Sequence, residues 1–278
     1  MDCMKPQLFK SARPIRVVLT STFAVLCLLL QLSSSPAQTL APETNANPSE
    51  VLVFESMRVP RWLAETVVRA AQTTNVDPAY MMALADKESS LLPDNKARTS
   101  SAEGLFQFIE GTWFEVLRRY GPKYGYTSEA EAIQIIRGRP VVSDSTDRER
   151  ILRLRRIPYL SALMAGEMIT THRQILANKG ARDPPFAELY IAHFLGVQGA
   201  RRFVELLSDE PGKSAPKVFP RAAKANHALF FALAKEATRT QKALTVAEVH
   251  ERIDAMIDLR VARYTSIRQD LAPVLALP

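Results

Sequence analysis

Glu88 is the carboxylate whose sequence neighbours best suit acid–base chemistry. Met81 and Leu84 precede it by seven and four residues, so all three share one face of a helix. A carboxyl group on an apolar face loses solvation, which disfavours its charged form and raises its pKa. A raised pKa suits a general acid that works near neutral pH. Taken alone, this spacing fits a buried glutamate paired with an arginine, or a glutamate at a helix end that reaches solvent, better than a catalytic acid. The apolar face comprises Met81, Leu84, Ala85, Leu91 and Leu92, whereas Asp86 and Lys87 fall outside it.

Ser89 and Gln107 are the polar residues that strengthen the case for Glu88. Ser89 follows Glu88 directly, and a polar loop then leads to residues 101–108, which include Gly104. A small residue, a glycine, two apolar residues and a glutamine predict a tight turn that presents an amide side chain. The amide of Gln107 offers two hydrogen-bond donors and an acceptor, which suits sugar hydroxyls and acetamido groups. The ordinary alternative for Gln107 is an amide on a helix surface.

Together these residues resemble the paired motifs of the soluble lytic transglycosylase family. In that family a Glu-Ser pair is followed by a serine-containing turn and then by Gly-Leu-Met-Gln. Residues 88–89 are Glu-Ser and residues 104–107 are Gly-Leu-Phe-Gln, so Phe106 replaces the usual methionine. The two motifs begin 16 positions apart, which agrees with the family. Thr112 fits the threonine that usually follows, and Glu110 stands where a proline is common.

The family's third motif, Ala-Tyr-Asn-Ala-Gly, is matched only loosely. If Gly196 corresponds to the glycine of that motif, His193 stands where tyrosine is expected and Phe194 where asparagine is expected. Tyr190 lies one helical turn before His193 and on the same face. Either side chain could hydrogen-bond the carboxylate or the bridging oxygen of a sugar. The alternatives are a core tyrosine and an interior histidine whose hydrogen bonds are satisfied. The resemblance covers roughly residues 75–200.

The resemblance implies an all-α, lysozyme-like domain whose active-site cleft binds alternating N-acetylglucosamine and N-acetylmuramic acid. Glu88 would be the catalytic residue, protonating the glycosidic oxygen and then acting as base toward the muramyl 6-hydroxyl. Attack of that hydroxyl on the anomeric carbon leaves a 1,6-anhydromuramyl end. The expected substrate-binding residues are Ser89, Gly104, Gln107, Tyr190 and His193.

An internal transfer of this kind needs no second carboxylate, whereas most glycoside hydrolases use two. Glu103, Glu110 and Glu115 are the candidates for a second one. Glu103 is expected in an exposed turn, and Glu115 is better explained as a capping partner of Thr112. A hydrolytic muramidase on the same fold is therefore an alternative.

A third hypothesis is a non-catalytic peptidoglycan-binding or scaffold protein, because His193 and Phe194 depart from the motif. The basic segment 139–156 and the helix 246–268 could then be partner surfaces. The ordinary interpretation of both is a solvated helix face. An isolated binder has no need for Glu88 on an apolar face, so we favour an enzyme.

The elements that position these residues are predicted to be helices. Residues 61–74 carry apolar side chains at helical spacing, and Asp77 with Pro78 marks the start of the helix that holds Glu88. Residues 93–104 are irregular and polar. Capping boxes are predicted at Thr112 with Glu115 (helix to Tyr120), Ser128 with Glu131 (helix to Gly138) and Thr245 with Glu248 (helix to about Arg268). Further helices are predicted over 148–156 as a solvated basic segment, from Pro158 to about Asn178, and near 184–195 and 198–207.

The N-terminus has the order of a secretory signal peptide, with a basic leader, an apolar run over 17–32 and small residues up to Ala37. An uncleaved membrane anchor is the alternative, although the run is short for a spanning helix. We expect an exported, periplasmic protein. Its expected parts are a signal peptide at 1–37, a flexible linker at 38–50, the catalytic domain at 51–258, and a C-terminal helix end and tail at 259–278.

Composition narrows the expected partners. The two cysteines, Cys3 and Cys27, both lie in the leader, so no thiol is expected in the mature chain. The formal charge is +7, of which the leader carries three, and a mildly basic mature chain suits an anionic cell-wall polymer. No basic cluster is interleaved with aromatics as in nucleic-acid grooves, and the histidines are scattered. We therefore expect peptidoglycan glycan strands as partner, with no nucleic acid, cofactor or metal, no membrane contact after cleavage, and an unidentified envelope partner at most.

Overall fold

The computed structural model describes residues 50–177, 182–233 and 241–272. The predicted signal peptide at 1–37 and residues 38–49 of the predicted linker lie outside this part of the chain. Among the described residues, no helix is both long enough and apolar enough to cross a membrane.

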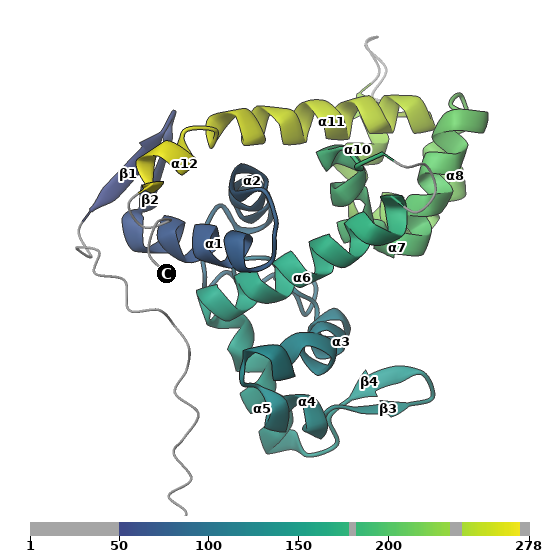
Figure 1. Ribbon diagram of the computed structural model, residues 1–278. Coiled ribbons are helices and arrows are strands. Elements are labelled where there is room, and N and C mark those ends of the chain that lie inside the picture. The colour runs from purple at the N-terminus through teal and green to yellow at the C-terminus, as the bar shows by residue number, and fades with distance from the viewer. Residues whose placement is uncertain (1–49, 178–181, 234–240, 273–278) are drawn as a thin grey trace, which may run out of the picture. The chain divides into compact units, whose positions relative to one another are not determined.

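Helices form most of the described chain, which confirms the all-α class (Figure 1). Three short antiparallel hairpins accompany them, β1 (Val51–Phe54) with β2 (Met57–Pro60), β3 (Gln134–Ile136) with β4 (Arg139–Val141), and β5 (Phe231–Leu233) with β6 (Gln241–Ala243). The larger helices are α1 (Arg61–Thr73), α2 (Pro78–Ser89), α3 (Glu110–Tyr120), α5 (Ser145–Arg153), α6 (Pro158–Ala177), α7 (Phe186–Asp209) and α11 (Val246–Arg263). The short ones are η1 (Gly121–Tyr124), α4 (Thr127–Ala132), η2 (Leu154–Arg156), α8 (Ala215–Val218), α9 (Pro220–Ala225), α10 (His227–Phe230) and α12 (Ile267–Asp270).

Two helix starts follow the predicted capping chemistry. The Asp77 side chain accepts a hydrogen bond from the Tyr80 backbone N–H, with proline at the first position of α2. Thr245 and Glu248 form a complete capping box at the start of α11. Helix α6 starts at Pro158 and ends at Ala177, close to the predicted bounds.

Two other predicted capping boxes are wrong. Helix α3 starts at Glu110, before Thr112, and Ile109 precedes it without a side-chain cap. Helix α4 starts at Thr127 without a side-chain cap, and the chain after it forms the β3–β4 hairpin, not a longer helix. In both cases the chain enters the helix two or three residues early, so the hydroxyl of the expected cap residue cannot reach the orphan N–H groups.

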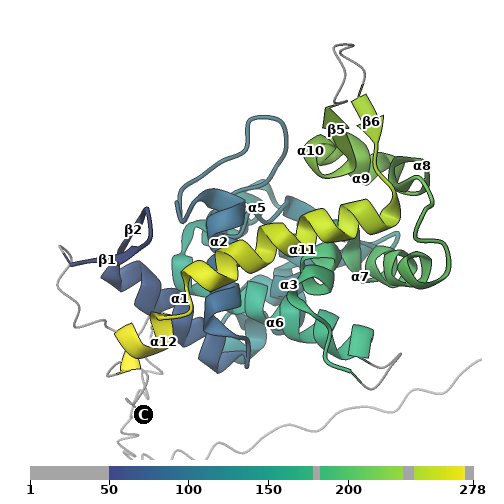
Figure 2. The ribbon, with the colours of Figure 1, turned by 90° about the horizontal axis from the view of Figure 1, so that it is seen from above.

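Helix α2 lies at the centre of the helical body. It contacts α1 on one side and α11 on the other, and α12 also lies against it (Figure 2). Helix α6 packs on α1, α3 and α7, while α11 crosses both α2 and α7. This arrangement holds the end of α2 and the first half of α7 in fixed positions.

Burial on all sides of α2 contradicts the single apolar face expected from the sequence. Tyr80, Met81 and Met82 are each fully buried, although three successive residues point in different directions around a helix. Asp86, expected outside the apolar face, is buried as well and accepts a hydrogen bond of 2.7 Å from Arg263 of α11. Leu92, expected on the apolar face, is 58% exposed because α2 ends at Ser89.

The segment after residue 258 belongs to the core. Helix α11 ends at Arg263, earlier than the predicted Arg268, and Tyr264, Ile267 and Leu271 are fully buried. The ring of Tyr264 lies 5.2 Å from that of Phe54. The C-terminal segment therefore closes the helical body against the β1–β2 hairpin.

Gly166 provides a test of the α1–α6 packing, because a Cβ atom built there would lie 2.0 Å from Thr74 Oγ1. We expect Gly166→Ala to lower the free energy of unfolding by about 1–3 kcal/mol, more than the helix propensity of alanine restores. Gly111→Ala in α3 is the matched control, since nothing lies within 4 Å of its Cβ position. Urea unfolding measures both variants, and equal effects would contradict the close contact.

Candidate active site

The structure brings Glu88, Tyr190 and His193 together, although more than 100 residues separate Glu88 from the other two. Glu88 lies in the last turn of α2, and its side chain is 16% exposed. Its Oε1 atom lies 3.7 Å from His193 Nε2. Tyr190 lies close enough for the charge of Glu88 to raise the pKa of its phenol beyond the effect of burial. The sequence left open which of Tyr190 and His193 would approach Glu88, and in the structure both do.

Helix α7 presents the two aromatic residues on one face and then breaks. The rings of Tyr190 and His193 lie nearly parallel with centroids 6.2 Å apart. Gly196 has φ 70° and ψ 161°, outside the helical region, and this agrees with the two helices predicted on either side of it. His193 is therefore held in the last turn of a short helix whose end is fixed by a glycine.

The pKa of Glu88 differs in direction from the sequence prediction. Burial raises this pKa. Protonated His193, followed by Lys87 and Tyr190, lowers it by more than burial raises it, so the pKa lies below its ordinary value. The main lowering contribution requires a charged imidazolium. When His193 is neutral that contribution is absent, and burial again favours the protonated carboxyl. The protonation states of Glu88 and His193 are thus coupled.

Ser89 and Gly104 position the site, and neither has a group free to bind substrate as predicted. The Ser89 hydroxyl is buried, donates to the Leu105 carbonyl oxygen (2.8 Å) and accepts from the Leu92 backbone N–H (3.2 Å). Gly104 has φ +85°, and a Cβ atom there would lie 2.2 Å from the carbonyl oxygen of Arg155. Only glycine allows this approach.

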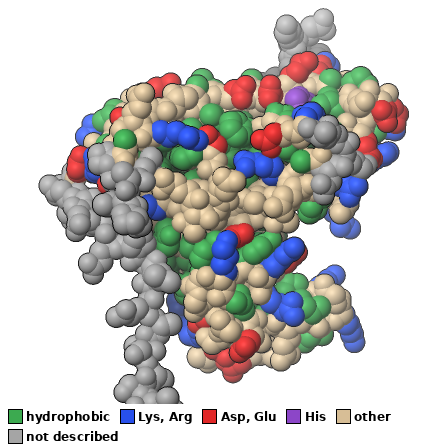
Figure 3. All heavy atoms as spheres, viewed as in Figure 1, with side chains coloured by type: hydrophobic (Ala, Val, Ile, Leu, Met, Phe, Trp, Pro, Cys, Tyr) green, Lys and Arg blue, Asp and Glu red, His purple; other side chains and the backbone are tan. Residues whose placement is uncertain are grey.

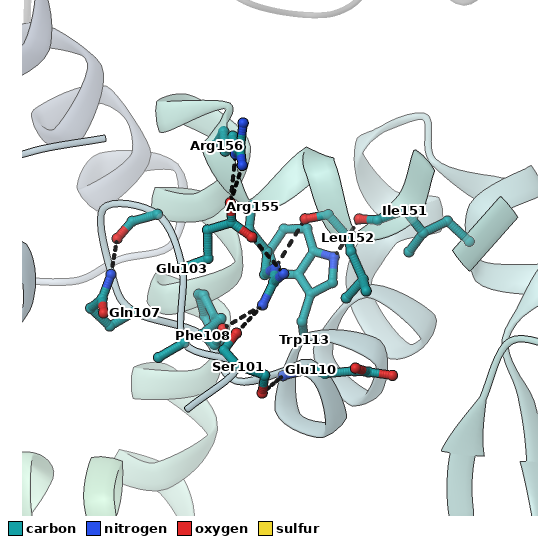
Figure 4. Close-up of polar contacts among 12 residues, drawn as sticks. Ser101, Glu103, Gln107, Phe108, Glu110, Trp113, Ile151, Leu152, Arg155 and Arg156 are labelled. Atoms are coloured by element: carbon teal, nitrogen blue, oxygen red, sulfur yellow. Dashed lines mark hydrogen bonds and ion pairs between the residues drawn. The ribbon is translucent and has the colours of Figure 1, made fainter. Parts of the chain in front are cut away.

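Gln107 uses its donors inside the loop. Its Nε2 donates to the carbonyl oxygens of Asn95 and Gly104, each at 2.9 Å (Figure 4). These bonds offset its own strained backbone, which has φ 48°. The side-chain oxygen of Gln107 is left as the group that a ligand can use, which makes this amide an acceptor for a sugar N–H or O–H.

A buried ion pair between Glu103 and Arg155 holds the same loop. Arg155 Nη2 lies 2.7 Å from Glu103 Oε2, and Arg156 binds the other carboxylate oxygen (Figure 4). Arg155 also donates to the carbonyl oxygens of Ser101 and Phe108. The prediction of an exposed Glu103 is wrong, and so is the prediction of a fully solvated basic helix, because Arg155 is buried.

A cleft of about 400 Å³ lies beside the Glu88–His193 pair, between α3, α6 and α7. Figure 3 shows the surface hollowed between the part that carries α7 and the part that carries β3 and β4. His193 lines this cleft, and its Nε2 atom lies 3.7 Å from Glu88 Oε1. The other polar residues of the wall are Thr112, Glu115, Arg119, Tyr120, Thr171 and His172.

The three candidate second carboxylates have different surroundings. Glu103 is buried in its ion pair, and Glu110 binds Arg148 through both oxygens. Glu115 is not a capping residue, because it lies in the middle of α3, and it lines the cleft. Glu115 is therefore the candidate that faces the same space as His193.

Residues 65–132 match the family model described as the transglycosylase SLT domain. The chain contains a transglycosylase SLT domain. This domain belongs to the lysozyme-like superfamily. The matched stretch runs from α1 to the end of α4 and includes Glu88 and the turn with Gln107. Tyr190 and His193 lie beyond it, so α7 completes the site from outside the matched part of the SLT domain.

Sequence reasoning missed three residues around the SLT-domain site. Lys87 Nζ lies 5.8 Å from the centroid of the Tyr190 ring, over its face. His172 lines the cleft from α6, and fully buried Tyr80 lies close enough for the Glu88 charge to raise its pKa beyond the effect of burial. None of the three belongs to a motif, and only their position in the folded chain identifies them.

Glu103→Gln tests whether the Glu103–Arg155 ion pair, which we call the clamp, holds the loop. The substitution leaves Arg155 buried without a counter-charge, and we expect the free energy of unfolding to fall by about 3–5 kcal/mol. Glu149→Gln on α5 is the matched control, because Glu149 is 75% exposed and its contact with Arg153 is 3.6 Å long. Urea unfolding should show a change below about 0.5 kcal/mol for the control. A small effect at both positions would contradict the clamp.

His172 should make the stability of the protein depend on pH. Burial lowers its pKa from 6.5 to about 4. Between pH 6.5 and 4 the unfolded state therefore binds a proton at this histidine that the folded state does not bind. His172 therefore has no such effect on the free energy of unfolding above pH 6.5, and it destabilises the folded protein progressively as the pH falls toward 4. We expect His172→Gln to lose less stability than the parent protein between pH 7.5 and 4.5, measured by urea unfolding. If the free energy of unfolding fell with pH by the same amount in both proteins, the prediction that His172 is buried and neutral would be contradicted.

Proposed function

We propose that this protein cleaves the β-1,4 bond between N-acetylmuramic acid and N-acetylglucosamine in peptidoglycan as a lytic transglycosylase, with Glu88 as proton donor. The observation that carries the proposal is the environment of Glu88. Its carboxylate is largely buried, yet it lies 3.7 Å from a histidine and close to a tyrosine, and no arginine is its ion-pair partner among the described residues. Asp86 and Glu103, in contrast, are buried against arginines.

The Glu88–His193 pair holds the proton that the reaction needs. An imidazolium at His193 lowers the pKa of Glu88 against the effect of burial and so favours the charged carboxylate. A sugar that fills the cleft removes water, and the neutral pair of carboxyl and imidazole then loses less solvation. Binding of the glycan therefore favours the form in which Glu88 carries the proton.

The proposed reaction is an internal transfer. Glu88 gives its proton to the glycosidic oxygen, and the carbon–oxygen bond to C1 of the muramyl residue breaks. The 6-hydroxyl of the same residue then bonds to C1 and forms a 1,6-anhydromuramyl end. No water and no second carboxylate is consumed, in agreement with arginine pairing at Glu103 and Glu110. The side-chain oxygen of Gln107 and the hydroxyl of Tyr190 are the groups we propose for orienting the sugars.

A hydrolytic muramidase is the second candidate, and Glu115 is the observation that favours it. Its position on the cleft wall would suit a carboxylate that activates water opposite Glu88. The two reactions leave different ends, since hydrolysis adds a water to the reducing muramic acid and the lyase reaction does not.

We further propose that the protein acts in the periplasm after removal of residues 1–37, on the basis of the basic, apolar and small-residue order of that leader. We also propose that the catalytic domain extends beyond residue 258. Buried Tyr264, Ile267 and Leu271 support this extension.

Digestion of purified sacculi, with the products identified by mass spectrometry, tests the reaction. We expect 1,6-anhydro products from the parent protein and at least a hundredfold lower release from Glu88→Gln, because general acid catalysis contributes about 10²–10⁴ in rate. Glu149→Gln, far from the cleft on exposed α5, is the matched control and should cleave like the parent. Circular dichroism shows that each variant is folded.

Other results would decide against parts of this proposal. Reducing ends with an added water, lost in Glu115→Gln, would establish the hydrolase. Binding of sacculi without any release would favour the scaffold protein. Undiminished cleavage by Glu88→Gln would show that the acid lies elsewhere.

A further inference from the structure

We propose that His193 is the base of the reaction, accepting at Nε2 the proton of the attacking 6-hydroxyl, so that acid and base are separate residues. This inference rests on the proposed transglycosylase function. It departs from a mechanism in which one carboxylate gives the first proton and takes the second.

His193 Nε2 and Glu88 Oε1 are 3.7 Å apart, and the imidazole lines the cleft. In the substrate, the leaving oxygen is bonded to C1 on the face from which the 6-oxygen must attack, because the bridge from C6 reaches only that face. The two oxygens therefore lie next to each other on one side of the sugar ring. Two proton-carrying atoms separated by 3.7 Å can each approach one of them.

The Nδ1 atom of His193 is buried and has no hydrogen-bond partner in the described part of the chain. A histidine base is usually supported by a carboxylate or carbonyl at its other nitrogen, which stabilises the imidazolium. Here the only carboxylate in contact with the ring, among the described residues, is Glu88 at Nε2. The imidazolium therefore becomes favourable only after Glu88 has lost its proton, which sets the order of the two transfers.

The groups that face His193 leave Glu88 as its main counter-charge. His172 faces the same cleft and stays neutral at the pH of the reaction, since burial lowers its pKa to about 4, so it does not compete for the proton. Other charged or titratable groups of the described chain line the same cleft or lie near Glu88 and Tyr190. They include Glu115, Arg119 and Tyr120 from α3, Lys87 from α2, Tyr190 from α7 itself and Arg260 from α11.

The proton balance of this sequence closes. Glu88 starts as the acid and ends the first step as a carboxylate, with its proton on the departing sugar hydroxyl. The bond from O6 to C1 forms as the O6–H proton moves to His193 Nε2. The imidazolium then returns this proton to the Glu88 carboxylate at 3.7 Å, and both residues regain their starting forms. No oxidant, metal or water takes part.

The identity of residue 193 is the sequence feature that permits this division. The related motif has a tyrosine at the corresponding position, and a phenol with a pKa near 10 is a poor proton acceptor at neutral pH. In this chain Tyr190, one turn earlier on the same helix, lies close enough to Glu88 for the carboxylate charge to raise its pKa beyond the effect of burial. His193 therefore adds a base without removing the hydroxyl from the site.

Chemical rescue is the test. His193→Ala opens space beside the cleft, and we expect at least a hundredfold fall in the rate of anhydro-product release from sacculi. Added imidazole should restore activity in proportion to its unprotonated fraction, as the pH is varied at fixed total imidazole. His172→Ala is the matched control, because it also removes a histidine from the cleft wall but at a position that does not contact Glu88; imidazole should not raise its rate.

His193→Gln provides a second variant that keeps the size and polarity of the side chain. The parent should lose activity at low pH as the base becomes protonated, and this acid limb should be absent from His193→Gln. Full activity of both variants would overturn the proposal. So would a His193→Ala variant that is slow, that imidazole does not accelerate and whose activity still falls at low pH. A parent protein that releases no anhydro products would instead overturn the proposed function, and the base role with it.

Discussion

The buried ion pair between Glu103 and Arg155 is the contact on which the geometry of the candidate site depends. Arg155 reaches the turn from η2 and binds the Glu103 carboxylate and two backbone carbonyl oxygens, so this charge fixes the loop at several points. The close approach of Gly104 to the carbonyl of Arg155 follows from this clamp. Ser89 then joins the fixed loop to the end of α2 through the Leu105 carbonyl. Because the desolvation of such a pair is costly, its presence is better explained by the fixed shape it imposes than by stability.

The partners of the carboxylates separate structural acids from the candidate catalytic acid. Asp86, Glu103 and Glu110 are each ion-paired with arginine side chains, which hold these carboxylates in one geometry. The partner of Glu88 is a histidine, a residue type whose ring nitrogens can donate or accept a proton. The sequence pattern singled out Glu88 by its apolar spacing, but α2 is buried on all sides and Asp86 is as hidden as Glu88. What distinguishes Glu88 is its partner, which the spacing within α2 could not reveal.

Local chemistry made part of the structure predictable from the sequence. The cap at Asp77, the capping box at Thr245 and the break at Gly196 each depend on a few adjacent residues, and all three are present. The turn that contains Gln107 was also predicted, because a glycine in a left-handed conformation leaves a local signature. The use of the Gln107 donors within the loop, the burial of Arg155 and the direction of the Glu88 pKa were not predictable. Each depends on residues brought together from distant parts of the chain, for which one sequence carries no pairing signal.

The two helix ends at the site bear on how firmly the Glu88–His193 pair keeps its proton. Glu88 lies in the last turn of α2, and His193 lies in the last turn of α7 before the break at Gly196. The carbonyl groups at a helix C-terminus carry partial negative charge, which disfavours a carboxylate and favours a cation. Both ends therefore favour a proton on the pair, whichever residue holds it, while burial of Nδ1 opposes a permanent imidazolium. The site must give a proton and recover one within a single turnover. It therefore needs a proton that the pair retains but that is not fixed to either residue.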